Sequence, residues 1–537
     1  MLGAGQASRL RPSTRMPEEL RMAQPQAAPL PPLTGGKLVA GTVALSLATF
    51  MNVLDSSIAN VSLPAIAGDL GVSPTQGTWV ITSFGVANAI SVPLTGWLTQ
   101  RFGAVRLFTL SVLLFVLASW LCGFAPSLEW LIAFRVLQGL VAGPMIPLSQ
   151  TLLLASYPPA KAGVALAMWA MTTLVAPVTG PLLGGWITDN VTWPWIFYIN
   201  VPVGLAAAAV TWRIFASRET PIRKAPIDSV GLGLLVLWVG SLQIMLDKGK
   251  ELDWFESAQI QGLGWTALIG FVVFVLWELK QDHPVVDIRL FARRNFVLGA
   301  MALSVAYCLF FGNVVLVPMW LQQYMGYTAT AAGMAMAPVG LLAIVLSPWV
   351  GKNVTKVDPR GLSTVAFLGF ALVLWMRSHF TVQSDMATIL IPTVLQGAAI
   401  AFFFIPLSAI TLSGLTPDKI PSASGLSNFC RITAGAMGTS VVTTIWDDRA
   451  TLHHVHLVEK ISVTDPAAVE AMGALTRAGL SVEQALSQVT RLIDQQAFTR
   501  AADDVFLASA WLFLALIPLV WLARPVRGAA VDAGGAH

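Results

Sequence analysis

The sequence predicts an all-α membrane protein with fourteen transmembrane helices. Of its 537 residues, 55 % are hydrophobic and only 11 % are charged, and the mean hydropathy is +0.70. A soluble chain of this length needs more charge on its surface. The apolar residues also gather in runs of roughly 20, the length that crosses the ~30 Å hydrocarbon core of a bilayer. These observations place the chain in a membrane and leave a channel, a carrier, a membrane enzyme or a receptor open.

Fourteen apolar runs account for most of the chain. Several contain Gly or Pro, which membrane helices tolerate when their neighbours satisfy the freed backbone groups. The runs start near Leu38, Gly77, Val105, Leu128, Ala162, Trp195, Val230, Ile260, Phe296, Ala329, Leu362, Ala387, Ala423 and Val505.

The basic residues orient these spans. An even number of spans puts both termini on one side, where 22 of the 32 Lys and Arg fall; eight lie on the other side and two within spans. Five of those eight lie in one long loop, where the positive-inside rule has little force. We therefore expect both termini in the cytoplasm. The net charge of +4 reflects this orientation and does not indicate a nucleic-acid partner.

A short cytoplasmic turn joins the second and third spans. It reads GWLTQRFGAVRLF, with Gly96 and Gly103 at its corners and Arg101 and Arg106 beside helix ends. The pattern resembles the loop signature of the major facilitator superfamily, although Gln100 stands where that family usually has Asp. A degenerate second copy, GKNVTKVDPRGL at 351–362, fits two six-span halves related by a repeat.

The resemblance implies a domain order. The composition of the first 36 residues predicts a basic, disordered cytoplasmic tail without the apolar core of a signal peptide. After it we expect a first six-helix bundle, two inserted helices, a second six-helix bundle and a short cytoplasmic tail. The second bundle includes a periplasmic loop at 447–504, whose SVEQALSQVTRLIDQQAFTRA has an amphipathic pattern that favours a partner over lipid. The five segments are 1–36, 37–216, 217–282, 283–524 and 525–537.

The fifth span contains APVTGPLLGG. Small residues at this spacing let two helix backbones approach closely, and proline loosens a helix, so simple packing is one explanation. The stretch also resembles the antiporter signature of the facilitator family, with Ala176 where Gly is usual. The residues that carry this resemblance are Pro177, Gly180, Pro181, Gly184 and Gly185.

Three further stretches resemble the fourteen-span drug:proton antiporters of this superfamily: LDSSIANVSLP, VITSFGVANAISVPLTGW and RVLQGLVAGPMIPLSQTLLLASYPP. The resemblance continues through WELKQDHPVVDIRLFARRNF and ITLSGL, and is specific to multidrug export proteins of Gram-negative inner membranes. It implies proton-driven efflux of lipophilic compounds, together with a periplasmic membrane-fusion adaptor and an outer-membrane channel.

Three charged residues lie well inside predicted spans: Asp55, Arg135 and Arg431. Each costs about 2.5 to 3.5 kcal/mol at a helix centre, so each needs a reason. Asp55 and Arg135 fall at similar depths in the outer half of the membrane. One explanation is a static ion pair. The other is a proton-coupling pair in which Asp55 titrates and Arg135 tunes it, because Arg is never deprotonated in a protein.

The substrate site is less readable. A cavity between the halves near the midplane is the general expectation. Arg431 would suit weakly acidic lipophilic compounds, or would serve as an internal counter-ion. Phe402, Phe403 and Phe404 are candidates for an apolar wall. The candidate substrate-binding residues are Asn60, Gln138, Tyr307, Asn313, Gln396, Asn428 and Arg431.

Other functions lack support in the sequence. We find no nucleotide-binding loop, no hydrolase elbow and no zinc-protease helix, so we expect neither an enzyme nor a cofactor. The HHVH stretch at 453–456 is typical of a solvated histidine cluster and does not predict a metal site. A proton-coupled uptake carrier and a non-transporting membrane sensor or scaffold remain alternatives to export.

Overall fold

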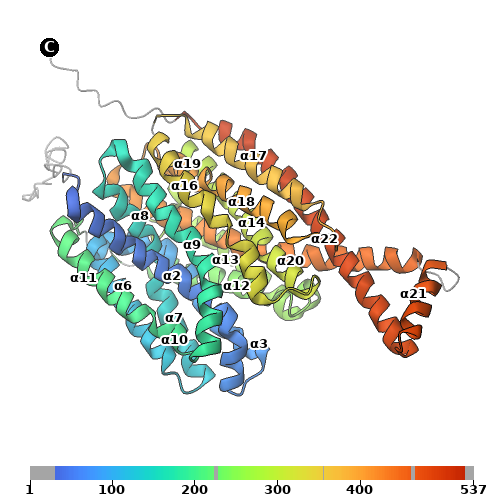
Figure 1. Cartoon of the computed structure of the whole chain (residues 1–537). Coiled ribbons are helices and arrows are strands. Elements are labelled where there is room, and N and C mark those ends of the chain that lie inside the picture. The colour runs from blue at the N-terminus through green and yellow to red at the C-terminus, as the bar shows by residue number, and fades with distance from the viewer. Residues whose placement is uncertain are drawn as a thin grey trace, which may run out of the picture. The chain divides into compact units, whose positions relative to one another are not determined.

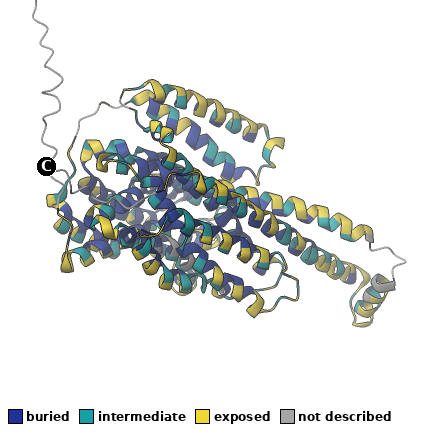
Figure 2. Ribbon diagram, turned by 90° about the horizontal axis from the view of Figure 1, so that it is seen from above, coloured by how far each residue is buried: buried dark blue, intermediate teal, exposed yellow. Residues whose placement is uncertain are grey.

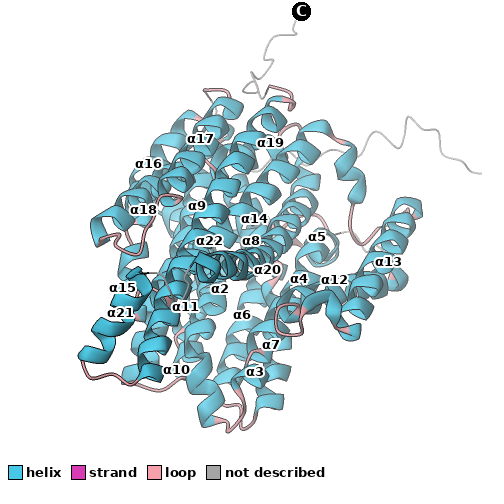
Figure 3. Ribbon diagram, turned by 90° about the vertical axis from the view of Figure 1, so that its right-hand side faces the viewer, coloured by secondary structure: helices cyan, strands magenta, loops and turns pink. Residues whose placement is uncertain are grey.

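The computed structural model describes residues 31–222, 226, 228–282, 284–354, 356–460 and 466–525. All regular structure within these ranges is helical, which confirms the predicted all-α class (Figure 3). The chain divides into two units, Met1–Pro32 and Leu33–His537, and only the second is described below. The predicted cytoplasmic tails fall almost entirely outside the described residues.

The first six predicted spans form one group of helices, the N-set (Figure 1). In chain order they are α2 (Gly35–Asp69), α4 (Trp79–Ser91) with η1 (Val92–Leu94) and α5 (Thr95–Phe102), α6 (Ala104–Gly123), α7 (Leu128–Ala142) with α8 (Met145–Ser156), α9 (Ala162–Asn190), and α10 (Trp195–Tyr198) with α11 (Asn200–Phe215). A short α3 (Pro74–Gly77) precedes α4.

Two inserted helices and six further spans follow. The inserted helices are α12 (Ser229–Lys248) and α13 (Ala258–Lys280). The C-set comprises α14 (Arg294–Gln323), α15 (Ala329–Met336) with α16 (Val339–Asn353), α17 (Pro359–Arg377), α18 (Met386–Ala401) with α19 (Phe404–Leu412), α20 (Ile420–Lys460) and α22 (Val482–Trp521), with α21 (Pro466–Arg477) before the last.

Every predicted apolar run lies on a helix. Among the described residues, twelve spans are long and apolar enough to cross a membrane. Helices α9 and α20 carry the other two predicted runs and are not among the twelve. The count of fourteen and the cytoplasmic position of the termini therefore remain predictions.

The two sets pack in the same pattern. Helix α2 contacts α8, α9 and α11, and α14 makes the equivalent contacts with α19, α20 and α22. Likewise α4 packs on α7 as α16 packs on α18, and α6 on α11 as α17 on α22. Helix α12 lies against α13, α4 and α20, so the inserted pair touches both sets. The domain boundaries predicted from the sequence remain a proposal.

Buried and exposed faces follow the membrane environment. Side chains between the helices are buried, whereas many on the outside are exposed (Figure 2). Several exposed side chains are large and apolar, such as Trp265 and Val272 on α13. In a bilayer such faces meet lipid tails, so their exposure is not an aggregation hazard.

The sets touch closely at the end predicted to be cytoplasmic, called here the inner end. A Cβ at Gly96 of α5 would lie 2.2 Å from the hydroxyl of Ser422 in α20. In the repeated position, a Cβ at Gly163 of α9 would lie 2.1 Å from the carbonyl oxygen of Gly351 in α16. The first glycine of each loop motif therefore lies where one set meets the other.

The turn after α5 is held by an acid that follows the sixth span. Gly103 has a φ of 84°, which glycine adopts without strain. The Glu219 carboxylate accepts hydrogen bonds from the backbone N–H groups of Val105 and Arg106, at 3.0 and 2.8 Å. A negative charge is favoured at this helix N-terminus. Glu219 thus provides a charge contact at a turn where Gln100 replaces the usual Asp.

The predicted periplasmic loop is largely helical. Helices α20 and α22 have 41 and 40 residues, about 60 Å each at 1.5 Å per residue, and their ends extend past the other helices (Figure 1). His453 and Arg449 of α20 bond to Asp504, and His454 bonds to Asp494. The amphipathic stretch is therefore the first half of α22 and packs on α20 of the same chain, which the sequence did not reveal.

Replacing Gly163 with Val should separate the inner ends, because the new side chain would overlap the Gly351 carbonyl. The distance between spin labels at Gln100 and Lys352, both exposed, should lengthen in a chain without its three native cysteines. Gly361→Val is the matched control, since nothing lies within 4 Å of its Cβ. An unchanged distance in Gly163→Val would show that this contact does not hold the sets together.

Candidate functional site

Asp55 and Arg135 form a buried ion pair. The Nη1 atom of Arg135 on α7 donates to Oδ2 of Asp55 on α2 at 2.5 Å, and both side chains have 0 % exposure. Their depths in the sequence suggested only that they could meet. The bond lies wholly within the N-set, so it joins α2 to α7 without crossing to the C-set.

Two amides complete the carboxylate's hydrogen bonds. Gln138 and Asn200 each donate to Oδ1 of Asp55, at 3.0 and 2.9 Å. Asn200 also donates to the hydroxyl of Ser119, which donates to the Phe197 carbonyl. Asp55 therefore accepts three hydrogen bonds from two other spans, and these bonds use both of its carboxylate oxygens.

Arg135 is held separately from the acid. Its Nε donates to the Val80 carbonyl at 3.0 Å, Nη1 also donates to Gln138, and the guanidinium lies 4.3 Å from the Phe84 ring centre. Within the described chain its Nη2 has no hydrogen-bond partner. Arg135 would thus keep several contacts if Asp55 became neutral, and it has one donor free for a new one.

The antiporter motif packs beside this ion pair. A Cβ at Gly180 would lie 2.4 Å from the Ser57 hydroxyl, and one at Gly184 would lie 2.8 Å from Ile58. Gly185 is looser, 3.9 Å from Val61. The side chains of Pro177 and Pro181 lie outside the described set. The motif's glycines therefore bring α9 against α2 within one turn of Asp55.

A second polar group lies between the sets and is called here the interface cluster: Gln150, Ser424, Asn428 and Arg431. Ser424 donates to Oε1 of Gln150, which comes from the N-set, and Asn428 donates to the same oxygen at 3.4 Å. Arg431 donates to Asn428 at 2.8 Å. These bonds join α8 to α20, so they cross from one set to the other.

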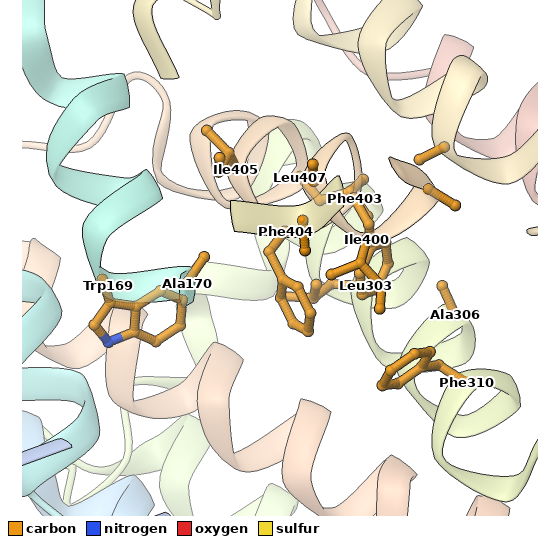
Figure 4. Close-up of a cluster of buried hydrophobic side chains, with 14 of the residues drawn as sticks. Trp169, Ala170, Leu303, Ala306, Phe310, Ile400, Phe403, Phe404, Ile405 and Leu407 are labelled. Atoms are coloured by element: carbon orange, nitrogen blue, oxygen red, sulfur yellow. The ribbon is translucent and has the colours of Figure 1, made fainter. Parts of the chain in front are cut away.

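Aromatic rings surround the cation of the interface cluster. The Arg431 guanidinium lies 4.5 Å from the Tyr307 ring centre, 5.7 Å from Phe404 and 5.8 Å from Trp169. Figure 4 shows two of these rings, Trp169 on α9 and Phe404 of the C-set, in the buried cluster of apolar side chains. Rings at these distances attract a cation. The Nε of Arg431 has no hydrogen-bond partner among the described residues.

The predicted substrate residues do not form one site. Asn428, Arg431 and Tyr307 come together, whereas Gln138 belongs to the ion pair. Asn60 is exposed and bonds to its own helix. The other two lie in the C-set: Asn313 donates to Ser509, and Gln396 accepts from Arg377.

The sequence analysis did not identify several residues that the structure places in these polar networks or buries as charges. Asn200 and Gln150 are polar residues in apolar runs and give no local signal of their partners. Arg377 and Glu278 are fully buried, yet each sits at a helix end, where a charge ordinarily reaches solvent. A buried charge at a span end can therefore be found only from the packing.

Comparison with known proteins identifies the family. Residues 45–439 match the model of the Major Facilitator Superfamily. The chain belongs to the major facilitator superfamily. It is accordingly a secondary membrane transporter and not an enzyme, as the sequence predicted.

Two relatives from this superfamily cover almost the whole chain. The multidrug export protein EmrB of Escherichia coli (strain K12) is 51 % identical over 507 residues, 94 % of this chain and 99 % of that protein. The fatty acid resistance protein FarB of Neisseria gonorrhoeae is 50 % identical over 495 residues, covering 92 % and 98 %.

A solved structure with the same fold is the human organic anion transporter MFSD10. Its TM-score is 0.58 at 13 % identity, covering 91 % of this chain and 100 % of that one. At this identity the likeness supports the facilitator fold alone.

The ion pair should respond unequally to loss of either partner. In Asp55→Leu the guanidinium of Arg135 stays charged and buried, whereas in Arg135→Leu the acid can take up a proton. We expect Asp55→Leu to lower the melting temperature in detergent more than Arg135→Leu does at neutral pH. The double variant should recover part of the loss. Equal losses that simply add would contradict a coupled pair.

Proposed function

We propose that the chain is a proton-driven multidrug efflux antiporter of a Gram-negative inner membrane that exports lipophilic, including weakly acidic, compounds. The observation that carries the proposal is the fully buried Asp55–Arg135 pair, whose acid is bonded by three neighbours. The 51 % identity to EmrB, a multidrug export protein, supports it.

Asp55 carries the proton in this mechanism. A carboxylate inside a membrane changes its protonation when its surroundings change, and an arginine does not. Protonation from the outer side removes the ion pair and leaves Arg135 on the Val80 carbonyl and Gln138. This favours the inward-facing state, and loss of the proton to the cytoplasm reverses the change.

Helices α2 and α9 connect the proton site to the interface cluster. The Asp55 network lies within the N-set, so its state must be passed on through helix packing. Helix α2 touches α9 at Gly180 and Gly184, and α9 presents Trp169 to the cation of Arg431. Movement of α2 would therefore displace a wall of the interface cluster.

The interface cluster is the proposed drug site. The cluster supplies one buried cation and hydrogen-bonding amides, and aromatic rings from both sets surround it. Such a mixture of apolar surface and few polar groups suits lipophilic compounds. Its bonds between the sets also mean that rocking the sets would open and close it.

The proton gradient supplies enough energy for this cycle. One proton moving inward down about 100 mV releases roughly 2.3 kcal/mol. That supports a substrate gradient of about fifty-fold per proton, before any pH difference is counted.

Export beyond the outer membrane requires partners. The proposed assembly includes a periplasmic membrane-fusion adaptor and, through it, an outer-membrane channel. The extended ends of α20 and α22 supply a docking surface, with exposed apolar side chains such as Val455 and Leu486. The His–Asp hydrogen bonds between α20 and α22 hold the two helices of this surface together.

Asp55→Asn should abolish drug export driven by a pH gradient, because an amide cannot carry the proton. The measurement is drug-dependent proton movement in proteoliposomes with an imposed gradient. Asp69→Asn is the matched control on the same helix, where the acid is exposed and accepts a hydrogen bond from Trp193. Arg135→Lys keeps the charge but loses the planar fork and should retain only part of the activity.

Three outcomes would overturn the proposed function. Exchange that persisted in Asp55→Asn would place the proton elsewhere. Wild-type protein that neither released protons on binding drug nor transported drug would be a sensor or scaffold instead. Drug uptake in the same direction as the protons would identify an import carrier.

Tyr307→Leu should weaken binding of a planar lipophilic drug about tenfold, because it removes a ring from the Arg431 cage. Tyr307→Phe keeps the ring and should lose much less. Phe124→Leu, an exposed aromatic at the outer end of α6, serves as the control. Affinity measured by fluorescence that is equal in all three variants would place the drug outside the interface cluster.

A further inference from the structure

The N-set and C-set contain the same glutamine in the same place. The fourth span reads RVLQG at 135–139, and the twelfth reads TVLQG at 393–397. Gln138 and Gln396 are both buried and each accepts a hydrogen bond at Oε1 from a neighbouring span. The donor to Gln138 from a neighbouring span is the Cys122 thiol, at 3.7 Å. The donor to Gln396 is Arg377, at 2.8 Å.

The donors themselves correspond. Helices α6 and α17 align without a gap, and Arg377 then stands where Cys122 does. The matched residues are Leu107, Phe115, Trp120 and Cys122 in α6 and Leu362, Phe370, Trp375 and Arg377 in α17. The buried cation thus lies on the fourth span in the N-set (Arg135) and on the eleventh span in the C-set (Arg377). In both sets it bonds to the repeated glutamine.

The acid has no counterpart. Aligning Asn60–Val61 with Asn313–Val314 places Cys308 opposite Asp55. Arg377 has 0 % exposure and forms no salt bridge within the described ranges, and its Nε and Nη1 have no hydrogen-bond partner there. Its Nη2 bonds only to the uncharged Thr393 and Gln396. A guanidinium that is buried, permanently charged and without a counter-ion is costly.

We propose that the carboxylate of an anionic amphiphile, a lipophilic monocarboxylate, binds at Arg377 and takes the place that Asp55 holds in the N-set. The planar guanidinium suits a carboxylate. Gln138 Nε2 donates to Asp55, and the equivalent Nε2 of Gln396 makes no hydrogen bond to the described chain, so it can serve the ligand in the same way.

The surroundings select a lipophilic acid over a small one. Leu374, Phe380 and Ile389 are buried and lie within about one turn of Arg377 or Thr393 in the chain, so a hydrocarbon tail bound there would meet apolar side chains. The relative FarB, 50 % identical, is a fatty acid resistance protein. This inference rests on the proposed export function and names one of its substrate classes. Since the site is sealed here, the ligand enters in another state of the transport cycle.

The test compares three probes with the same twelve-carbon tail: dodecanoate, dodecanol and dodecyltrimethylammonium. Binding is measured at equilibrium on the full chain in nanodiscs, without a proton gradient. Arg377→Gln should weaken dodecanoate binding about tenfold or more, the effect of losing a charged hydrogen-bond partner. Binding of dodecyltrimethylammonium should stay within about twofold. Arg377→Lys should give an intermediate loss for dodecanoate alone.

A second variant tests the site without removing the cation. Gln396→Glu supplies a carboxylate beside Arg377 from the protein itself, so it should raise the melting temperature and displace dodecanoate. Gln100→Glu, at an exposed position of the inner turn, is the control and should do neither.

Three results would overturn the proposal. Equal loss of all three probes in Arg377→Gln would show a structural role. Competition by acetate or chloride as effective as dodecanoate would show a small-anion site. Unchanged dodecanoate binding in Gln396→Glu would separate the ligand from this cation. Because no gradient is applied, none of these results depends on whether Asp55 carries the transported proton.

Discussion

The structure depends on one ion pair that has no access to water. Asp55 and Arg135 bring opposite charges into a medium where neither is tolerated alone, and their neighbours are arranged around that fact. Two side-chain amides donate hydrogen bonds to the acid, and a backbone carbonyl and an aromatic ring contact the cation. Glycines of α9 let that helix approach α2 beside the pair. In the proposed cycle, a proton taken up by Asp55 removes this ion pair, and the spans that bond to the carboxylate then lose a shared contact.

Much of the fold could be read from the sequence. The apolar runs gave the helices, because length and composition are sufficient to define a membrane span. The depth of Asp55 and Arg135 gave their proximity, since a helix rises by a fixed amount per residue. The glycines of the loop and antiporter motifs lie at close helix contacts. These features share a local cause, and a local cause is visible in one sequence.

The rest could not be read, because it depends on packing between distant segments. Gln138 and Gln396 looked alike as polar residues in apolar spans, yet Gln138 bonds to both an acid and a cation, whereas Gln396 bonds to a cation. Arg377 lies at the end of α17, where a charge ordinarily reaches solvent, yet it is fully buried. The amphipathic half of α22 has the pattern of a surface helix, and its partner proved to be α20 of its own chain.

The length of α20 has a mechanical consequence. One unbroken helix carries Ser422 at the inner contact, Arg431 among the aromatic rings and His453 near its far end. A straight helix behaves as a rod, so a small tilt at one end becomes a larger displacement at the other. A force on α20 outside the membrane would therefore be transmitted to Arg431 and to the inner contact, because one continuous helix connects them. Substrate binding at Arg431 and docking of other proteins outside the membrane would then both depend on the tilt of α20.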